Sequence, residues 1–395
     1  MKNFVNRNMV KKDMVYFDNA ATTYPKPEPV YAFMDEFYRE CGVNVGRGQH
    51  DMASKASKLY AETKYLVREL FNCHDKEVVF SSSATESLNI VLQGIKWSDN
   101  YTVYISPFEH NSVMRVLYYL QKEYKINIKQ LAVKKDALEY NLEKIKYDFQ
   151  DTKPDVVIMS HASNVCGLIA PIKEVCGIAK ESNAVTIVDM AQTAGLIPTD
   201  LSQIKSDYVV FAGHKTLYGG FGIGGLILDH TTALKPLMYG GSGIDSLSRT
   251  MPKTVPERFE AGSRNIQAAA GLNAALKWIL EQGVDKIYIK EKEYTKKLTN
   301  LIKEFSNIKV VGFKDADSNI GVISCLFDGY SSDNIGQVLN EKGIAVRTGL
   351  HCSPVAHEFF GTSPEGTVRF SVGYFNNDDD LVKLREALEY IELNG

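Results

Sequence analysis

The sequence contains no apolar run that approaches the roughly 18 residues needed to cross a bilayer. Its N-terminal stretch, Met1–Phe17, carries basic side chains but no continuous apolar core, so it does not resemble a secretory signal. The formal net charge is only −3, which gives no electrostatic reason to expect nucleic acid or a membrane surface as a partner. We therefore expect a cytoplasmic globular protein.

Cysteine pairs of the C-x-x-C type are also absent. The six cysteines are scattered along the chain, and without paired spacing we expect no zinc or other metal site. In a cytoplasmic chain of this size, scattered cysteines are typical of free thiols, most of them small core residues. The chain also lacks internal repeats and low-complexity segments.

Composition and length indicate one large and one small domain. The chain has 395 residues, of which 44% are hydrophobic and 24% charged. Between Glu77 and Leu228, apolar strand-like segments alternate with amphipathic helical ones, which predicts a mostly parallel sheet covered on both faces. After about Gly271, a Lys- and Glu-rich helical tract and further short strands predict a compact α+β unit. The predicted fold class is therefore α/β, with a large domain over residues 25–270 and a small domain formed by residues 1–24 and 271–395.

Lys215 is the first candidate for chemistry. It follows the apolar run Asp207–Phe211, which is typical of a buried strand, and it stands in a glycine-rich turn. A lysine that is partly desolvated there becomes a nucleophile, so Lys215 is a candidate Schiff-base lysine. The alternative is a solvated lysine in a surface loop. The nearby glycine cluster Gly219–Gly225 lacks the strand–GxGxxG–helix context of a dinucleotide site.

Three further signals lie at the ends of predicted strands. The stretch Ser81–Asn89 stands between a strand and a helix, where free N–H groups and hydroxyls suit a phosphate; the alternative is an N-cap with a capping box at Ser83–Glu86. His110 follows the next strand and suits ring stacking or proton transfer, or else a structural role. Asp189 ends a strongly apolar strand, with Gln192 three residues later. Such an aspartate needs a cationic partner, which a protonated ring nitrogen would supply, or it caps a helix.

In combination these signals describe one kind of site. A phosphate cradle, a ring stacker, an acid for a pyridinium nitrogen and a Schiff-base lysine occur in that order, each at a strand end. Enzymes that use pyridoxal 5′-phosphate (PLP) need these four roles together. The sequence therefore predicts a PLP site.

The chain resembles the PLP-dependent class V aminotransferases, in their cysteine desulfurase and selenocysteine lyase branch. The resemblance covers nearly the whole chain and implies PLP fold type I. It rests on motifs that follow one another in the family's order: YFDNAATTYPKP, SATES, FEHNS, SNVCG, DMAQ, GHK, FEAGSRN, RTGLHCSP and VRFSVGYFN. The short span between Cys352 and Arg369 resembles the branch with a short, ordered cysteine loop.

The resemblance implies a role for each motif. Lys215 would hold PLP and move a proton between substrate and cofactor, and His110 would stack on the pyridine ring and assist proton transfer. Asp189 would keep the ring nitrogen protonated, and Arg369 would bind the substrate carboxylate. Asn164 would contact substrate or cofactor. The remaining implied cofactor contacts are Ala84, Thr85 and His214 at the phosphate, Gln192 at the ring oxygen, and Gly241 and Ser263 at the phosphate of a partner subunit in a homodimer.

Cys352 decides the function that the resemblance implies. In the desulfurase hypothesis its thiolate attacks the sulfur of L-cysteine, a persulfide forms on Cys352 and L-alanine leaves. Arg347 and His351 are near in sequence and would favour the thiolate. The sulfur would pass to an acceptor protein or a thiol reductant, as in sulfur mobilisation for iron–sulfur cluster assembly. The alternative for Cys352 is a small buried residue in a hairpin.

Other functions stay open from the sequence. Selenocysteine as substrate, another C–S lyase activity, an aminotransferase activity and a non-catalytic PLP-binding module are the alternatives. Two departures from the family pattern bear on the details: Ala212 stands where a hydroxyl residue is usual, and Leu350 stands where histidine is frequent. Ala212 removes one expected hydrogen bond to the phosphate.

Overall fold

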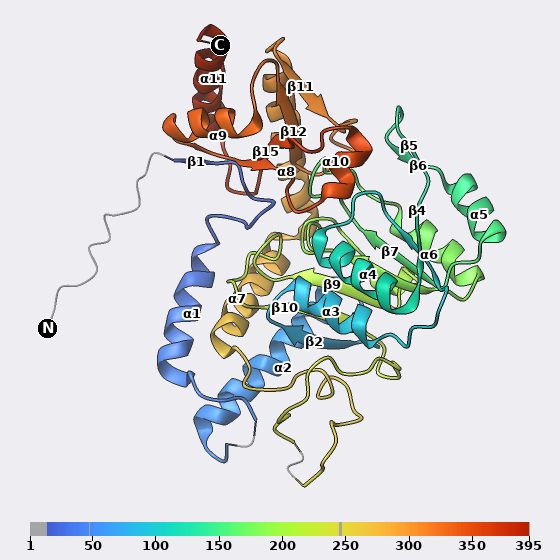
Figure 1. The fold of residues 1–395 in the computed structure, drawn as a ribbon. Helices are drawn as coiled ribbons and strands as arrows, with labels where there is room; N and C mark the ends of the chain where they lie inside the picture. The colour runs from blue at the N-terminus through green and yellow to red at the C-terminus, as the bar shows by residue number, and fades with distance from the viewer. Residues whose placement is uncertain (1–13, 47, 245–246, 395) are drawn as a thin grey trace, which may run out of the picture.

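The computed structural model describes residues 14–46, 48–244 and 247–394 (Figure 1). A seven-stranded sheet forms its centre, in the order β2-β10-β9-β8-β7-β3-β4. The strands are β2 (Glu77–Ser81), β3 (Thr102–Ile105), β4 (Asn127–Gln130), β7 (Val156–Ser160), β8 (Val185–Asp189), β9 (Tyr208–Ala212) and β10 (Gly224–Leu228).

Five neighbouring strands of this sheet, from β9 to β4, run parallel, and β10 is antiparallel to both of its neighbours. The strands of this sheet carry apolar runs that are buried on both faces; in β7 and in β10 every residue is buried. This confirms the predicted mostly parallel sheet. Because parallel strands share one carboxyl edge, the residues that follow β7, β8 and β9 are brought together there.

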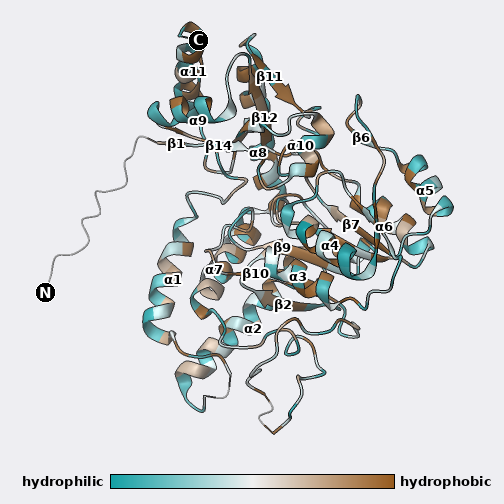
Figure 2. Cartoon of the chain, in the orientation of Figure 1, coloured by the Kyte–Doolittle hydropathy of each residue, from teal (hydrophilic) through white to brown (hydrophobic). Residues whose placement is uncertain are grey.

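Helices cover both faces of the sheet, and Figure 2 shows their polar sides turned outward. One face packs on the helices α3 (Ala84–Gly94) and α4 (Asn111–Tyr124). The other face packs on α2 (Asp51–Phe71), α5 (Leu142–Asp151), α6 (Ile172–Glu181) and α7 (Ile266–Gln282). Helix α1 (Glu28–Cys41) lies outside them, against α2 and α7.

A second, four-stranded antiparallel sheet, in the order β11-β12-β15-β14, has its own apolar core. It consists of β11 (Ile308–Val311), β12 (Val322–Phe327), β15 (Thr367–Ser371) and β14 (Arg347–Gly349). The helices α8 (Val284–Lys303), α9 (Ser332–Glu341) and α11 (Asp378–Leu393) pack on this sheet, whereas α10 (Pro354–Phe360) packs against Phe108 and Val165. Two short pairs complete the fold: β1 (Val15–Tyr16) with β13 (Ile344–Ala345), and β5 (Val133–Lys134) with β6 (Glu139–Tyr140). The α+β unit predicted after residue 271 therefore contains the predicted kinds of element.

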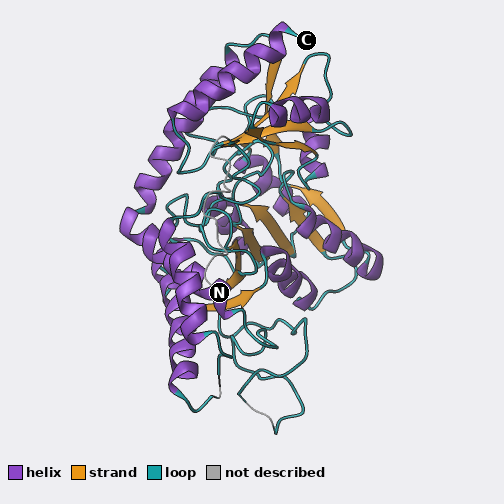
Figure 3. Cartoon of the chain, turned by 90° about the vertical axis from the view of Figure 1, so that its left-hand side faces the viewer, coloured by secondary structure: helices purple, strands orange, loops and turns teal. Residues whose placement is uncertain are grey.

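Helices α7 and α8 follow one another and meet at Gly283. In Figure 3, helices run along one edge of the molecule past both sheets. The predicted domain boundary at residue 271 lies within α7, which packs against α1 and α2. The domain limits thus stay a prediction, and residues 1–13 of the predicted small domain lie outside the described residues. Among the described residues, no helix is both long and apolar enough to span a bilayer.

Candidate active site

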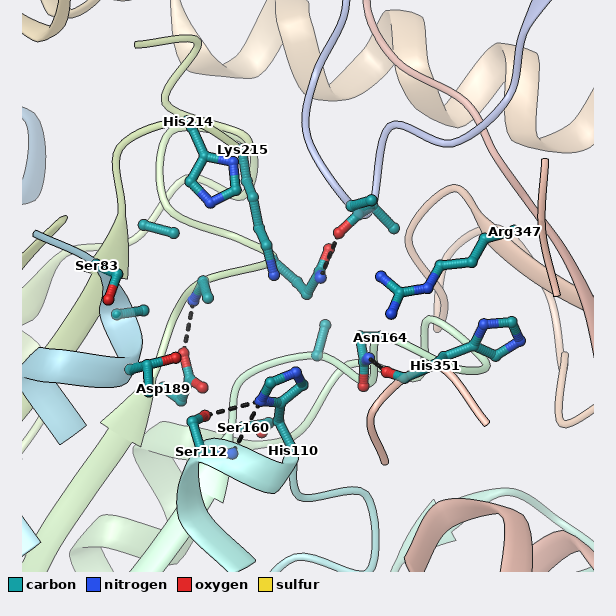
Figure 4. Close-up of a pocket in the computed structure, with 18 of the residues that line it drawn as sticks. Ser83, His110, Ser112, Ser160, Asn164, Asp189, His214, Lys215, Arg347 and His351 are labelled. Atoms are coloured by element: carbon teal, nitrogen blue, oxygen red, sulfur yellow. Dashed lines mark hydrogen bonds between the residues drawn. The ribbon is translucent and has the colours of Figure 1, made fainter. Parts of the chain in front are cut away.

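A cavity of about 230 Å³ lies at the carboxyl edge of the parallel strands, between the two sheets. Figure 4 shows Lys215, His110 and Arg347 pointing into the same space from different elements. The predicted site residues that line this cavity are Ala84, Thr85, His110, Asn164, Asp189, Gln192, His214, Lys215 and Arg369. The fold thus brings nine of the predicted positions to one place, although they are spread over most of the chain.

Lys215 stands in the turn after β9. The hydroxyl of Thr23 donates a hydrogen bond to the Lys215 carbonyl oxygen at 3.0 Å, which fixes the backbone of this turn. Burial lowers the pKa of the Lys215 amine to about 8, opposed by the carboxylate of Asp189 and assisted by the charge of Arg369. No carboxylate lies within ion-pair distance of this amine in the described part of the chain. A neutral, nucleophilic amine is therefore accessible near pH 8.

His110 caps the first turn of α4. Its Nδ1 accepts a hydrogen bond from the backbone N–H of Ser112 at 3.0 Å. Burial, and then the positive charges of Lys215 and Arg347, lower the pKa of His110 to about 4. The imidazole is therefore neutral near pH 7, and because Nδ1 accepts a hydrogen bond, the ring proton lies on Nε2. A flat, neutral ring is suited to stacking on a cofactor ring.

Asp189 is the last residue of β8 and is buried. Its Oδ1 accepts a hydrogen bond from the backbone N–H of Ala191 at 2.8 Å, within a turn rather than at the start of an α-helix. Burial raises the pKa of the Asp189 carboxyl, while the positive charge of Lys215 lowers it. Nearby, the amide of Gln192 donates to the carbonyl oxygen of Ala20 at 2.9 Å. A buried carboxylate of this kind is stabilised by a cationic partner.

The N-terminus of α3 opens on the same cavity. Ser83 caps the helix, since its hydroxyl accepts a hydrogen bond from the N–H of Glu86 at 3.2 Å. The predicted capping box is wrong in its second hydrogen bond, in which the N–H of Ser83 would donate to the Glu86 carboxylate. This carboxylate instead accepts a hydrogen bond from the N–H of Ser82 at 2.7 Å. The N-cap and the phosphate cradle are compatible, because Ser83 and Ala84 still line the cavity. A Cβ on Gly224 would lie 2.7 Å from the Ser83 backbone, so a side chain there would displace the cradle.

Arg369 lies on β15 and is 1% exposed. Its Nη1 donates to the carbonyl oxygen of Asn164 at 3.0 Å, and its Nη2 donates to Oδ1 of Asp18 at 2.7 Å. Its Nε is buried and has no hydrogen-bond partner among the described residues. Arg369 also lines the cavity, and a guanidinium in this position is suited to bind a carboxylate.

Cys352 lies beside the cavity rather than in it. It lines an adjoining groove, about 550 Å³ in volume, that shares Thr85, His110 and Ser112 with the cavity. Nη2 of Arg347 donates a hydrogen bond to Sγ of Cys352 at 3.1 Å. The sulfur therefore faces a positive charge at the boundary between cavity and groove.

Two features fix the loop that carries Cys352. His351 and Cys352 have φ angles of +48° and +59°, a left-handed conformation that side chains adopt only when surrounding contacts hold it. The amide of Asn164 supplies such contacts: its Nδ2 donates to the His351 carbonyl at 2.7 Å, and its Oδ1 accepts from the Ser353 hydroxyl at 2.7 Å. Behind the loop, residues 354–360 form helix α10, which the sequence did not predict.

Gly241 and Ser263 are the predicted site residues that line neither this cavity nor the adjoining groove. Ser263 lines a different pocket, together with Ser81 and Ser82. The two positions are neighbours, since the N–H of Gly262 donates to the Gly241 carbonyl at 2.8 Å. Their role toward a second subunit stays a prediction.

The site also contains groups that sequence reasoning did not assign. Asp18 pairs with Arg369, and Glu109, beside His110, accepts hydrogen bonds from the N–H and the hydroxyl of Ser160. Both residues stand inside recognised motifs, YFDNAA and FEHNS. No spacing rule, however, connects residue 18 with residue 369, so this pair could not be found from the sequence.

Comparison with known proteins agrees with this geometry. The model of the family described as aminotransferase class-V matches residues 15–384. The chain belongs to this family. Enzymes of the family depend on PLP. Relatives include a probable cysteine desulfurase of Pyrococcus abyssi, 32% identical, with 96% of this chain and 94% of that protein aligned. Another is a probable cysteine desulfurase of Methanothermobacter thermautotrophicus, 30% identical, with 96% of this chain and 95% of that protein aligned.

The fold agrees with solved structures of the same family. The apo structure of cysteine desulfurase from Thermococcus onnurineus superposes with a TM-score of 0.90 at 28% identity, covering 100% of both chains. The fold is therefore that of PLP fold type I enzymes, as the resemblance implied.

The residues present also fit PLP on structural grounds. The Nδ1 of His214 is buried and, within the described residues, has no hydrogen-bond partner, although His214 lines the cavity. The start of α3 offers N–H groups for an anion, and Gly224 leaves that approach open. The buried acid Asp189 is suited to pair with a pyridinium nitrogen. The amine of Lys215, with its lowered pKa, is suited to react with an aldehyde.

Proposed function

We propose that this protein is a cysteine desulfurase, which converts L-cysteine to L-alanine and keeps the sulfur as a persulfide on Cys352. The observation that carries the proposal is the hydrogen bond from Arg347 to Sγ of Cys352 at the border of the cavity. The chemistry of transamination does not require a thiol beside the cavity, whereas sulfur transfer to the enzyme does. The relatives named above, described as probable cysteine desulfurases over nearly their whole length, support the same activity.

The cofactor would be PLP, held by residues of the cavity. Lys215 would carry it covalently, Asp189 would pair with its ring nitrogen, and the N-terminus of α3 with His214 would take its phosphate. Bound PLP supplies the electron sink that makes the α-carbon of an amino acid acidic. Ala212, at the end of β9, contributes no hydroxyl, so the phosphate depends more on the backbone of α3.

Arg369 would bind and orient the substrate. Its guanidinium is held in one plane by Asn164 and Asp18, so little rotamer freedom is lost when it accepts a carboxylate. The amine of Lys215 is neutral above its pKa of about 8 and can take up the proton from the α-carbon. His110, neutral with its proton on Nε2, presents a hydrogen-bond donor that does not add charge to the cavity.

Cys352 performs the sulfur transfer. Its thiolate forms a bond to the substrate sulfur while the substrate C–S bond breaks, and the electrons of that bond stay with the three-carbon fragment. A proton delivered to this carbon completes L-alanine, so atoms and electrons balance without an external oxidant. The persulfide then lies in the groove lined by His110, Ser112 and Arg115, from which an acceptor thiol can remove the outer sulfur.

The test is a single turnover with L-cysteine, followed by intact-protein mass spectrometry and measurement of alanine. We expect one added sulfur atom on the wild type with a matching amount of alanine, and neither on Cys352→Ala. Cys41→Ala is the matched control, because Cys41 is buried at the end of α1 and lines neither the cavity nor the groove. Turnover that persists in Cys352→Ala would point instead to a C–S lyase or an aminotransferase.

The proposal extends to partners and to location. The sulfur acceptor is a protein thiol or a small thiol reductant, and selenocysteine is the competing substrate to test. The pocket lined by Ser263, with Gly241 beside it, supports a homodimer in which these residues serve the partner's cofactor. A cytoplasmic location is supported by the cysteines, all six of which are free thiols, as predicted.

A further inference from the structure

Asp18 and Arg369 form an ion pair that the proposed chemistry does not use. Nη2 of Arg369 lies 2.7 Å from Oδ1 of Asp18, and the side chains are 1% and 21% exposed. Burial lowers the pKa of Arg369, and the charge of Asp18 opposes this shift. Asp18 is thus the counter-charge that offsets the desolvation cost of the buried guanidinium in the substrate-free protein.

Asp18 is fixed in this position by its own segment. Its carbonyl oxygen accepts hydrogen bonds from the hydroxyl of Tyr16 at 3.2 Å and from the N–H of Ala21 at 3.1 Å. The next residues are tied to β15, since the N–H of Ala20 donates to the Ser371 hydroxyl at 2.9 Å. The carboxylate of Asp18 is therefore presented by a backbone that is itself bonded to the strand carrying Arg369.

The two members of the pair face different spaces. Arg369 lines the cavity, whereas Asp18 does not. Asp18 therefore approaches the guanidinium from outside the substrate site, and it leaves other N–H groups of Arg369 free for a ligand. A carboxylate that enters the cavity meets a guanidinium whose charge is already partly balanced by a carboxylate.

We propose that Asp18 sets the affinity of Arg369 for the substrate carboxylate, so that it is a positioning and specificity-determining residue for amino-acid substrates. This inference rests on the proposed function in that Arg369 is taken as the carboxylate receptor. Two carboxylates on one guanidinium repel each other, which holds the affinity for substrate, and equally for the product L-alanine, at a moderate value. Moderate affinity for the product permits its release.

The direction of the effect follows from charge. Asp18→Asn keeps an oxygen that accepts the hydrogen bond from Arg369 but removes the negative charge. The substrate-free protein then contains a buried cation that has lost its carboxylate partner, and an incoming carboxylate can balance it. We expect carboxylate ligands to bind about three- to tenfold more tightly, the effect of one charge a few ångströms away when solvent screens it almost as strongly as in bulk water.

The experiment compares the holoenzyme and Asp18→Asn in three measurements. The KM for L-cysteine should fall about three- to tenfold, and kcat should not rise, because the product L-alanine is then also held more tightly. The dissociation constant of propionate, measured by calorimetry, should fall by the same factor, whereas the neutral analogue propionamide should show no change. The thermal midpoint should fall without ligand, and propionate should raise it more than in the wild type.

Asp35→Asn is the matched control, because it removes the charge of an aspartate paired with Arg39 on the exposed side of α1. It should leave all three measurements unchanged. If Asp18→Asn does not yield folded protein, Asp18→Ser carries the same expectation, since it also removes the charge. Propionate affinity that is unchanged or weaker in a folded Asp18 variant would overturn the proposal, even if the thermal midpoint falls. Since propionate binding needs no turnover, this outcome is independent of whether the protein desulfurates cysteine.

Discussion

Nη2 of Arg347 and Sγ of Cys352 are 3.1 Å apart, a contact between the first residue of β14 and the loop that follows this strand. The loop turns through two consecutive left-handed residues, His351 and Cys352, to return the sulfur to the arginine. A positively charged neighbour of this kind stabilises a thiolate, and the thiolate is the nucleophile. The backbone geometry of the six residues 347–352 therefore sets the distance between this sulfur and the guanidinium of Arg347.

The first prediction concerns this contact. Arg347→Gln keeps a hydrogen-bond donor but removes the positive charge that faces Sγ of Cys352, so this sulfur should become about tenfold less reactive as a nucleophile. The rate of alkylation of Cys352 by iodoacetamide, followed by peptide mass spectrometry, should fall accordingly. Arg39→Gln on α1 should have no effect. An alkylation rate unchanged in Arg347→Gln would mean that this arginine does not activate the sulfur.

A second prediction concerns Asn164, whose amide holds the residues on both sides of Cys352. In Asn164→Asp, a carboxylate oxygen replaces the N–H that faces the His351 carbonyl, so an attractive contact becomes a repulsive one. Ser353→Ala removes a single neutral hydrogen bond, worth about 1 kcal/mol. Hydrogen exchange of residues 350–354 should therefore rise strongly in the first variant and slightly in the second.

The same pair of variants separates loop order from folding. Persulfide formation should fall in the order wild type, Ser353→Ala, Asn164→Asp, while exchange in the central strands stays unchanged. Equal protection of residues 350–354 in all three proteins would show that other contacts hold the loop.

A third prediction uses the pKa of Lys215, which burial lowers to about 8. Only the neutral amine attacks an aldehyde, so the rate at which PLP attaches to the apoprotein should rise as pH rises through about 8 and then level off. For an ordinary lysine the rate would continue to rise to about pH 10.4. Stopped-flow absorbance between about pH 6.5 and pH 9.5 measures this profile. A rate that still increases at the upper limit would contradict a buried amine, and Lys215→Ala should show no attachment.

The sequence predicted the parts of the site that follow from one rule. Asp189 and Lys215 directly follow or end buried strands, and parallel strands share their carboxyl edge, so their convergence could be expected. The contacts between distant segments follow no such rule. Asp18 pairs with Arg369 across the whole chain, and the amide of Asn164 holds a loop near residue 352, because three-dimensional packing determines these distances.

Local patterns also left choices that only packing resolves. Ser83 followed by Glu86 matches a capping box, yet the Glu86 carboxylate turns to the N–H of Ser82, which lies one residue further away along the chain. Helix α10 was missed because its seven residues are too few for a periodic pattern, and Pro354 at its start also suits a turn.

A last prediction concerns Glu109, which is fully buried between β7 and His110. Its two oxygens accept hydrogen bonds from the N–H of Ser160 at 2.7 Å and from its hydroxyl at 3.0 Å. Burial, and then the negative charge of Asp189, raise the pKa of Glu109 to about 8. In the unfolded chain a glutamate titrates near pH 4.3.

Because the folded pKa exceeds the unfolded one, the stability from this group is complete below about pH 4.3 and is lost as pH rises through about 8. Glu109→Gln removes this titration and keeps both contacts with Ser160, with the amide nitrogen donating to the hydroxyl. The variant should therefore gain unfolding free energy relative to the wild type as pH rises from about 5 to 8. Urea denaturation at several pH values measures this difference, and Glu36→Gln, on the exposed side of α1, is the control. A difference that does not change with pH would show that Glu109 is ionised in the folded protein, and that Ser160 and the surrounding dipoles stabilise two buried carboxylates side by side.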